Sequence, residues 1–402
     1  MTPDTSIYLH IPFCVHRCAY CDFNTYAGQE ALIPAYIDAL IREIETVAAL
    51  QLTPAPAHSI FFGGGTPSLV PTPHLAAVMD ALRRSFALTA NLEATLEANP
   101  GTVTAQSLTE MRAAGLNRLS FGVQSANPNE LRLLERAHNF FDVIQSVKWA
   151  RQAGFKRINL DLIYGLPEQS LADWQNSVKR IADLRPEHIS MYGLTIEHGT
   201  PFGRWAARGL LPIPNPDLAA EMYEWAAEYL STHSDYAQYE ISNWATPGEE
   251  SRHNLQYWRN LPYFGFGAGA HGYINKARYS NVVRIKTYID RLSGKTSANL
   301  SDSIRDSAKK SDFSPAIAHH HRPTLRQAMQ ESMMLGLRLT IEGVADSAFR
   351  TRFGVGIAEA FPREVDDLTG LSLLEWHNDS LRLAPRARLI GNQVFIRFVG
   401  DE

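Results

Sequence analysis

The stretch Cys14-Val15-His16-Arg17-Cys18-Ala19-Tyr20-Cys21 contains all three cysteines of the 402-residue chain. Their thiolates are separated by three and two residues, so a short loop could direct them at one metal centre, either zinc or an iron–sulfur cluster. A closed zinc site needs four ligands, and His16 or a distant histidine would have to supply the fourth. An iron–sulfur cluster held by three thiolates leaves one iron open to another ligand.

The residues around this loop resemble a known superfamily. Tyr8-Leu9-His10-Ile11-Pro12-Phe13-Cys14 and Cys21-Asp22-Phe23 are similar to the radical S-adenosylmethionine (SAM) enzymes, in particular to their HemN-like branch. The resemblance implies a [4Fe–4S] cluster on Cys14, Cys18 and Cys21, with SAM bound to the open iron. One-electron reduction of such a cluster cleaves SAM to a 5′-deoxyadenosyl radical, and the protein positions and shields this chemistry.

The first 240 residues alternate short apolar runs with amphipathic stretches such as Ala31–Leu50 and Leu75–Phe86, which predicts βα units and a parallel sheet. The predicted strands are Ser6–Ile11, His58–Phe62, Glu93–Glu97, Arg118–Gly122, Ile158–Ile163 and His188–Leu194. Six strands are too few for an eight-stranded barrel. The resemblance implies an α/β fold with a partial (β/α)6 radical SAM barrel over residues 1–240, whose site lies at the carboxyl ends of the strands.

Three further regions follow the barrel. We expect residues 241–292 to form an aromatic and glycine-rich extension packed on the barrel, and residues 293–322 to form a polar linker with His319-His320-His321 at the solvated surface. Residues 323–402 should form a small HemN-type domain, mainly helical and winged-helix-like. Its predicted elements are helices at Leu325–Leu337, Val344–Phe353 and Ala358–Leu371 and a β pair of Leu381–Leu383 with Val394–Phe398.

Composition excludes several classes of protein. Hydrophobic residues make up 45% of the chain and charged residues 20%, as in ordinary globular proteins. A net charge of −4 and the lack of a clustered basic face argue against nucleic acid as a partner. We find no signal peptide and no apolar run of the roughly 18 residues that span a bilayer. Clustered cysteines suit a reducing interior, so a cytoplasmic location is expected, with membrane contact only through a partner.

A glycine-rich segment follows the second predicted strand, at Phe61-Phe62-Gly63-Gly64-Gly65-Thr66-Pro67. Glycines there allow either a simple turn or a close approach of the backbone to a ligand. Matched to the HemN-like branch, the segment implies contact with the amino group of SAM. The SAM-binding residues implied by the resemblance are Tyr8, Tyr20, Gly64, Gly65, Thr66 and Glu97, with Tyr8 beside the adenosine and Tyr20 beside the cluster.

Polar residues also follow three later strand ends, at Gln124, Arg136 and Asp161. An unpaired aspartate on an apolar strand is costly to bury, so Asp161 needs either an arginine partner or a ligand. The resemblance assigns these three residues to SAM or to a second SAM molecule.

The segment Arg252-His253-Asn254-Leu255-Gln256-Tyr257-Trp258 has two interpretations. His253 could be a hydrogen-bonded core imidazole, or an axial ligand of haem iron beside the flat aromatic surfaces of Tyr257 and Trp258. The pattern His-Asn-x-x-Tyr-Trp resembles the motif of the haem chaperones within the HemN-like branch, which implies haem binding by His253, Tyr257 and Trp258.

Two functions are therefore compared: an oxygen-independent coproporphyrinogen III oxidase, and a haem chaperone that delivers haem to apo-haemoproteins and receives electrons from a donor. The oxidases carry a further cysteine two positions after the third cluster ligand, where this chain has Phe23, and an N-terminal extension before the first strand. They also lack the motif at His253. All three features favour the chaperone, and no catalytic residue is assigned.

Overall fold

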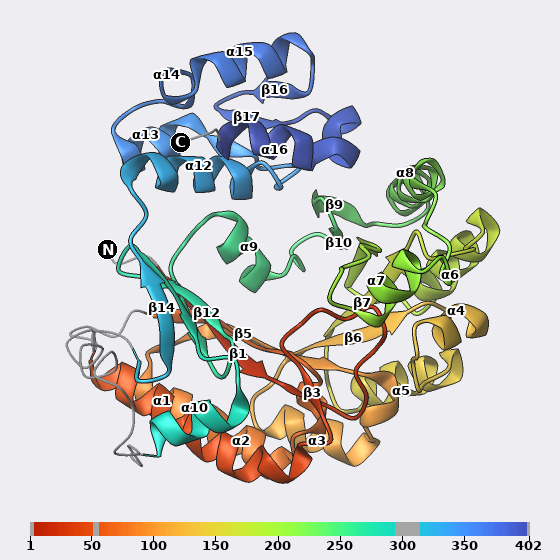
Figure 1. The fold of residues 1–402 in the computed structure, drawn as a ribbon, viewed down its shortest axis with the longest axis vertical. Helices are drawn as coiled ribbons and strands as arrows, with labels where there is room; N and C mark the ends of the chain where they lie inside the picture. Colours follow the sequence, from red (N-terminus) through yellow and green to blue (C-terminus); the bar gives the residue numbers. More distant parts are fainter. Residues whose placement is uncertain (1–3, 51–55, 294–313, 400–402) are drawn as a thin grey trace.

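The computed structural model describes residues 4–50, 56–293 and 314–399. Two parts are visible in Figure 1: a large curved sheet covered by helices, and a C-terminal domain at the top of the view. Within these residues one 12-stranded sheet contains most of the strands, in the order β14-β13-β12-β11-β1-β4-β5-β6-β7-β8-β10-β9. A two-stranded ribbon pairs β2 (Phe13–Cys14) with β3 (Tyr26–Ala27) beside it.

The centre of the sheet is the partial barrel, in which six neighbouring strands run parallel. They are β1 (Thr5–Ile11), β4 (Ala57–Gly64), β5 (Leu88–Ala98), β6 (Arg118–Gln124), β7 (Arg157–Tyr164) and β8 (His188–Gly193). Each of the six predicted strands is confirmed, with differences only at the ends.

Successive side chains of a strand point to opposite faces of the sheet, and the barrel uses the two faces differently. In β1 the alternate residues Ile7, Leu9 and Ile11 are fully buried in the apolar core shared with the helices. In later strands the opposite face is polar, as at Glu97 and Asp161, which line a cavity inside the barrel. The core therefore lies between sheet and helices, and the concave face is left for chemistry.

Helices connect the parallel strands and cover the convex face of the sheet (Figure 1). They are α1 (Ile33–Ala49), α2 (Thr72–Ser85), α3 (Ala105–Ala113), α4 (Pro128–Leu133), α5 (Phe140–Gln152) and α6 (Leu171–Asp183). After β8 come α7 (Pro201–Ala207), which packs beside the cysteine loop, and α8 (Pro216–His233), which packs against α6. In α1 the buried residues Tyr36, Ile37, Leu40 and Ile44 recur at helical spacing, which explains why this stretch packs as a helix. Both predicted amphipathic segments are helical.

Both edges of the barrel sheet are extended by later parts of the chain. On one side β11 (Tyr263–Phe266) runs parallel to β1, followed by the antiparallel strands β12 (His271–Ile274) and β13 (Ala277–Asn281). On the other side β10 (Asn243–Ala245) pairs antiparallel with β8, and β9 (Ala237–Glu240) pairs with β10. The expected extension also contains two helices, α9 (Arg252–Trp258) and α10 (Ile285–Leu292).

The predicted linker, residues 293–322, lies mostly outside the described residues, which exclude 294–313. Its last part is not a linker in the structure: β14 (Ile317–His321) pairs antiparallel with β13 and forms the edge of the large sheet. The three histidines His319, His320 and His321 belong to this strand, and their side chains are exposed. Backbone pairing to β13, which no side-chain pattern in this polar segment reveals, explains the difference.

The C-terminal domain has its own apolar core, which includes Met333, Phe349, Phe361, Leu381 and Phe398. Its helices are α12 (Leu325–Gly336), α13 (Asp346–Phe353), α14 (Ile357–Ala360), α15 (Pro362–Gly370) and α16 (Gly391–Val399). Its strands β15 (Val344–Ala345), β16 (Leu374–His377) and β17 (Ser380–Leu383) form a small sheet in the order β15-β17-β16.

One predicted element of this domain is wrong. Val394–Phe398 was expected to pair as a strand with Leu381–Leu383, but it forms part of α16, and β16 pairs with β17 instead. Val394, Phe395 and Phe398 are buried while Ile396 is exposed. This spacing fits one face of a helix, and a short apolar run can be mistaken for a strand.

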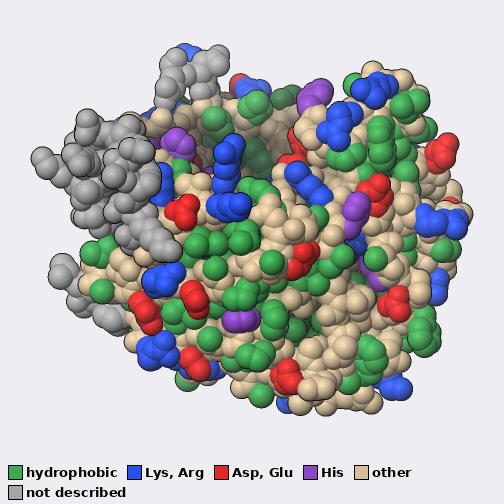
Figure 2. All heavy atoms as spheres, turned by 60° about the horizontal axis from the view of Figure 1, so that its bottom comes forward, with side chains coloured by type: hydrophobic (Ala, Val, Ile, Leu, Met, Phe, Trp, Pro, Cys, Tyr) green, Lys and Arg blue, Asp and Glu red, His purple; other side chains and the backbone are tan. Residues whose placement is uncertain are grey.

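Polar contacts join the two parts of the molecule. Arg278 of β13 forms an ion pair with Glu331 of α12 at 2.8 Å, and Arg259 pairs with Glu342 at 2.7 Å. On the face shown in Figure 2, Lys and Arg side chains are scattered, with Asp and Glu among them. Among the described residues, no helix has both the length and the apolar content that crossing a bilayer requires.

Candidate metal centre and cofactor cavity

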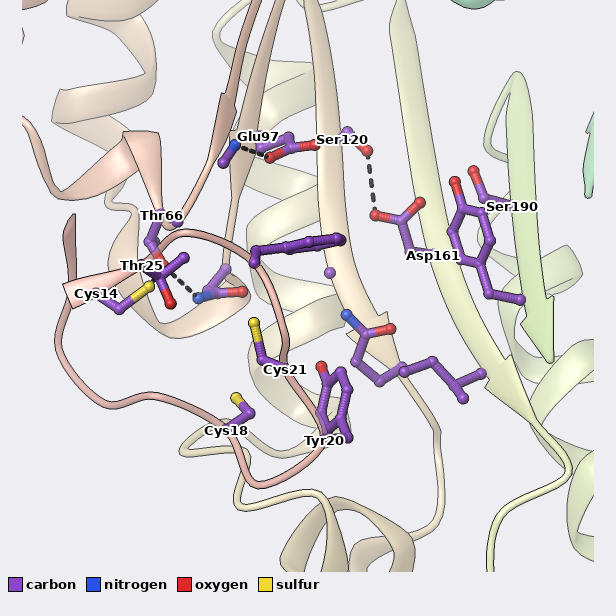
Figure 3. Close-up of a pocket in the computed structure, with 18 of the residues that line it drawn as sticks. Cys14, Cys18, Tyr20, Cys21, Thr25, Thr66, Glu97, Ser120, Asp161 and Ser190 are labelled. Atoms are coloured by element: carbon purple, nitrogen blue, oxygen red, sulfur yellow. Dashed lines mark hydrogen bonds between the residues drawn. The ribbon is translucent and has the colours of Figure 1, made fainter. Parts of the chain in front are cut away.

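The cysteine loop leaves the carboxyl end of β1 and closes one side of a cavity of about 570 Å3 inside the barrel. Cys14 is buried and Cys18 and Cys21 are half-buried, and all three line this cavity (Figure 3). Burial raises the pKa of the Cys14 and Cys21 thiols. No three His, Cys, Asp or Glu side chains in the described part of the chain are grouped to hold a single metal ion. Three thiolates without a fourth protein ligand match the donor chemistry of an iron–sulfur cluster.

His16, the alternative fourth ligand, takes part in a different contact. Its Nε2 atom lies 2.8 Å from Glu135, and both side chains are substantially exposed. This contact turns His16 toward a carboxylate at the surface, which weakens the case for a closed four-ligand zinc site.

Two side chains support the sulfur atoms: Thr66, which follows β4, and Arg136, which lies in the loop between α4 and α5. The Thr66 hydroxyl donates to Cys14 Sγ at 3.7 Å, and Arg136 Nη1 donates to Cys18 Sγ at 3.6 Å. Asn99 connects the two, since its amide donates to Thr66 Oγ1 at 3.1 Å and its Oδ1 accepts from Arg136. Hydrogen bonds and a nearby cation stabilise thiolate over thiol, as a metal ligand requires.

Gly64 and Gly65 bring the end of β4 against the cysteine loop. Gly64 has φ +114°, and a Cβ there would lie 2.6 Å from the His10 ring. A Cβ on Gly65 would lie 2.6 Å from the carbonyl oxygen of Phe13 and 3.0 Å from Cys14 Sγ. No side chain fits at either position, so the glycines are required by the loop as well as by any ligand above it.

Glu97 lies at the end of β5 and lines the cavity, where its Oε2 accepts the Gly64 N–H at 3.0 Å. Burial, with a contribution from the neighbouring Asp161, raises the pKa of Glu97 to about 8. At neutral pH this carboxyl therefore holds a proton in the absence of a ligand, and a cationic or hydrogen-bonding ligand would stabilise its charged form.

Asp161 of β7 faces the cavity from the opposite side, with Ser190 beside it (Figure 3). Its partners are neutral: Ser120 Oγ donates to Oδ2 at 3.2 Å and Asn159 Nδ2 donates to Oδ1 at 2.7 Å. Burial raises the pKa of Asp161. Neutral donors therefore satisfy the carboxyl in this structure, and the charge of Arg118 acts on it through space.

The remaining predicted SAM residues divide between the cavity and its wall. Gln124, Arg136 and Tyr20 line the cavity. Tyr8 stands behind this lining, with its ring centroid 6.3 Å from that of Phe61 and its hydroxyl 3.0 Å from His10 Nδ1.

Helix α9, which carries the motif at residues 253–258, packs against β1 and β4 and covers the floor of the barrel. Glu93 of β5 fixes its start, because the carboxylate accepts the backbone N–H groups of Arg252 and His253. His253 is 1% exposed, with Nδ1 2.9 Å from Ser59 Oγ and Nε2 2.8 Å from the Tyr257 hydroxyl. Burial lowers the pKa of His253 to about 3. In this conformation both ring nitrogens are engaged, as in a core imidazole.

The other members of the motif point in different directions. Trp258 lies toward the C-terminal domain, where the Arg338 guanidinium stands 4.4 Å from the centre of its ring. Asn254, in contrast, lines the barrel cavity together with the cysteines. The three predicted haem residues thus do not form one open surface in this conformation.

The sequence reasoning missed several residues that the fold brings to the cavity: Asn99, Arg118, Asn159, His188 and Asn254. A signal existed for three of them. Asn99 follows Glu97 at the same strand end, and Asn254 stands inside the motif. Arg118 begins a predicted strand, and the alternation of side chains along a strand puts it on the same face of the sheet as Ser120 and Gln124.

Comparisons with known proteins agree with this site. The Radical SAM superfamily model matches residues 8–181, and the HemN C-terminal domain model matches residues 324–390. Heme chaperone HemW of Bacillus subtilis is 39% identical over 397 residues, covering 98% of this chain and 99% of its own. The chain belongs to the HemW family. Heme chaperone HemW of Mycobacterium tuberculosis H37Rv is 37% identical, covering 98% of this chain and 94% of its own.

The fold of this HemW-family chain is also that of a solved oxidase. Coproporphyrinogen III oxidase (HemN) from Escherichia coli, described as a radical SAM enzyme, superposes with a TM-score of 0.80 over 99% of this chain and 90% of its own. The two sequences are 23% identical, so this likeness establishes the α/β radical SAM fold and nothing about activity.

Proposed function

We propose that this protein is a haem chaperone, which binds haem and transfers it to apo-haemoproteins. The observation that carries the proposal is the similarity along the whole chain to the HemW haem chaperones of several bacteria. Phe23, which stands where the oxidases carry a further cysteine, is 64% exposed beside the cluster loop, and it supports the same assignment.

The chaperone would carry a [4Fe–4S] cluster on Cys14, Cys18 and Cys21, with SAM at the open iron. Such a cluster supplies an electron to SAM or to the haem iron. Thr66 and Arg136 stabilise the thiolates, Gly64 and Gly65 leave room above the loop, and Glu97 and Asp161 offer carboxyl groups to the polar atoms of SAM. Gln124 and Arg136 lie where either one or two SAM molecules could reach them.

Haem would be held through His253, with the rings of Tyr257 and Trp258 beside it. Since Nε2 of His253 bonds to Tyr257 and Nδ1 to Ser59, one of these hydrogen bonds has to break before the imidazole can bind iron. Haem loading therefore requires a rearrangement of α9, which is a short helix with its start fixed by Glu93.

Titration of the reconstituted protein with haem, followed by absorbance, tests the function. We expect saturable, stoichiometric binding in wild type, weaker binding in His253→Ala with the cluster intact, and loss of the cluster but retained folding in Cys14→Ala. Transfer to an apo-haemoprotein is then followed by its absorbance. The proposal fails if wild type shows no saturable haem binding and converts coproporphyrinogen III under anaerobic reducing conditions.

A further inference from the structure

The cavity continues past the cysteine loop to the floor of the barrel, beyond the residues assigned to SAM. Its lining includes Arg118 of β6 and Asn254 of α9 together with the cluster cysteines, so the floor and the metal centre share one enclosed space. Nothing in the proposed cluster or SAM contacts uses these two side chains.

Arg118 is a buried cation without a partner. Its side chain is 3% exposed, and within the described ranges its guanidinium makes no hydrogen bond and no ion pair at 4.0 Å or less. Arginine is rarely buried unless paired, because removing its charge from water is costly. A guanidinium that faces a cavity under these conditions is suited to bind an anion, and its planar fork matches a carboxylate.

Two carboxyl groups that point inward from β5 and β7, Glu93 and Asp161, are hydrogen-bonded to other groups and form no ion pair with Arg118. Glu93 accepts the backbone N–H groups of Arg252 and His253, and Asp161 accepts from Ser120 and Asn159. The positive charge of Arg118 acts on Asp161 and on His253 only through space.

Two neutral groups near Arg118 have unused hydrogen-bonding capacity. Thr95 lies opposite Arg118 in the register of β5 and β6, and its buried hydroxyl has no partner among the described atoms. The side-chain amide of Asn254 makes no hydrogen bond within the same described residues, although its backbone N–H is bonded to Ser251. Arg118 thus supplies a cation, and Asn254 an amide donor, to the same cavity. Both groups can donate hydrogen bonds to an acceptor on a ligand.

We propose that Arg118 and Asn254 bind a carboxylate group of a ligand that enters the cavity past the cysteine loop. The carboxylate is a propionate of haem, so this inference rests on the proposed function. SAM, whose amino-acid end would bind the open iron of the cluster, serves as the control ligand.

Equilibrium titration of the reconstituted full-length protein tests this site with three probes: haem, haem dimethyl ester and SAM. Arg118→Gln should weaken binding of haem by about tenfold to a hundredfold, the effect of losing a charge-assisted hydrogen bond, and should leave the affinity for SAM unchanged. Arg118→Lys and Asn254→Leu should lie between it and wild type. Exposed Arg208 provides the matched control, and Arg208→Gln should leave all three affinities unchanged.

Thermal unfolding without ligand separates a binding role from a structural one. A buried arginine that serves a ligand destabilises the ligand-free folded protein, because its charge is unpaired. Arg118→Gln should therefore have a Tm equal to or above that of wild type. Added haem should then raise the Tm of wild type more than that of the Arg118→Gln variant. A ligand-free Tm clearly below wild type would give Arg118 a structural role and overturn the proposal.

The pattern over the probes separates this inference from the proposed function. Weaker binding of haem by Arg118→Gln, with the dimethyl ester bound equally by both proteins, assigns the site to a propionate. The inference is overturned, and the chaperone function is not, if wild type binds haem and both Arg118→Gln and Asn254→Leu bind it as tightly. An absence of saturable haem binding by wild type overturns both, and weaker binding of SAM by Arg118→Gln overturns the assignment to a propionate.

Discussion

His253 Nε2 and the Tyr257 hydroxyl lie 2.8 Å apart, one turn along α9. Tyr257→Phe removes this hydrogen bond and keeps the aromatic ring. We expect haem affinity to rise about fivefold, because a competing hydrogen bond of about 1 kcal/mol no longer holds the nitrogen. Haem titration measures the change. An affinity of Tyr257→Phe equal to wild type, together with full binding by His253→Ala, would exclude this imidazole as a ligand.

The same site predicts a simple pH dependence. Burial lowers the pKa of His253 to about 3, so the imidazole is neutral between about pH 6 and pH 8. Haem affinity should therefore not fall through protonation of His253 in this range. Titrations of wild type and His253→Ala at several pH values provide the check, and a transition near the ordinary histidine pKa that disappears in the variant would contradict it.

Gly65→Ala should impair the metal centre, because the added Cβ would lie 2.6 Å from the Phe13 carbonyl oxygen and 3.0 Å from Cys14 Sγ. We expect a lower iron content after reconstitution and a lower Tm. Gly370→Ala is the matched control, since a Cβ there meets no atom within 4 Å. Full cluster occupancy in Gly65→Ala would show that the loop can move aside.

Much of this geometry could be predicted from the sequence because it follows from local patterns. Strand ends carry Gly64, Glu97 and Asp161, and parallel strands bring their carboxyl ends together, so residues far apart in the sequence were expected in one cavity. The cysteine spacing likewise predicted that the three thiols would lie together, and all three line this cavity. These signals depend only on which face of the sheet each strand residue points to and on the order of the strands.

Other features depend on tertiary contacts that a pattern does not contain. Both nitrogens of His253 are engaged because Ser59 and Tyr257 approach from different elements, and the sequence left the choice between core imidazole and ligand open. Arg118 was overlooked since only the folded barrel shows that no carboxylate of the described residues forms an ion pair with it. The helix at Val394–Phe398 was misjudged because its run is too short for periodicity to decide.

Glu97 should make stability depend on pH. Its pKa is about 8 in the folded protein and 4.5 when unperturbed, so between these values the folded state holds a proton that the unfolded state has released. Raising the pH through this window therefore lowers the free energy of unfolding. Glu97→Gln removes the effect. We expect the Tm of wild type to fall relative to the variant between about pH 5 and pH 8.5, and parallel curves would contradict the raised pKa.

The contact between the two parts of the molecule can be tested at Arg278. Its guanidinium bonds to Glu331 at 2.8 Å and to Asn260 at 2.8 Å, and the ion pair is about one-fifth exposed. Arg278→Ala should lower the free energy of unfolding by about 1–3 kcal/mol, as expected for hydrogen bonds to charged groups. Denaturant unfolding measures this loss. Arg397→Ala, which removes an exposed pair with Asp367, should cost less than about 1 kcal/mol.

The parallel pairing of β1 with β11 has a consequence for biosynthesis. β1 leaves the ribosome well before its partner on one side, which begins at Tyr263, and before α9, which covers the barrel floor and begins at Arg252. Contacts of such long sequence separation form late. A nascent chain therefore exposes its cysteines and one edge of β1 through much of translation, and a chain interrupted before Tyr263 would keep that edge open to pairing with other chains.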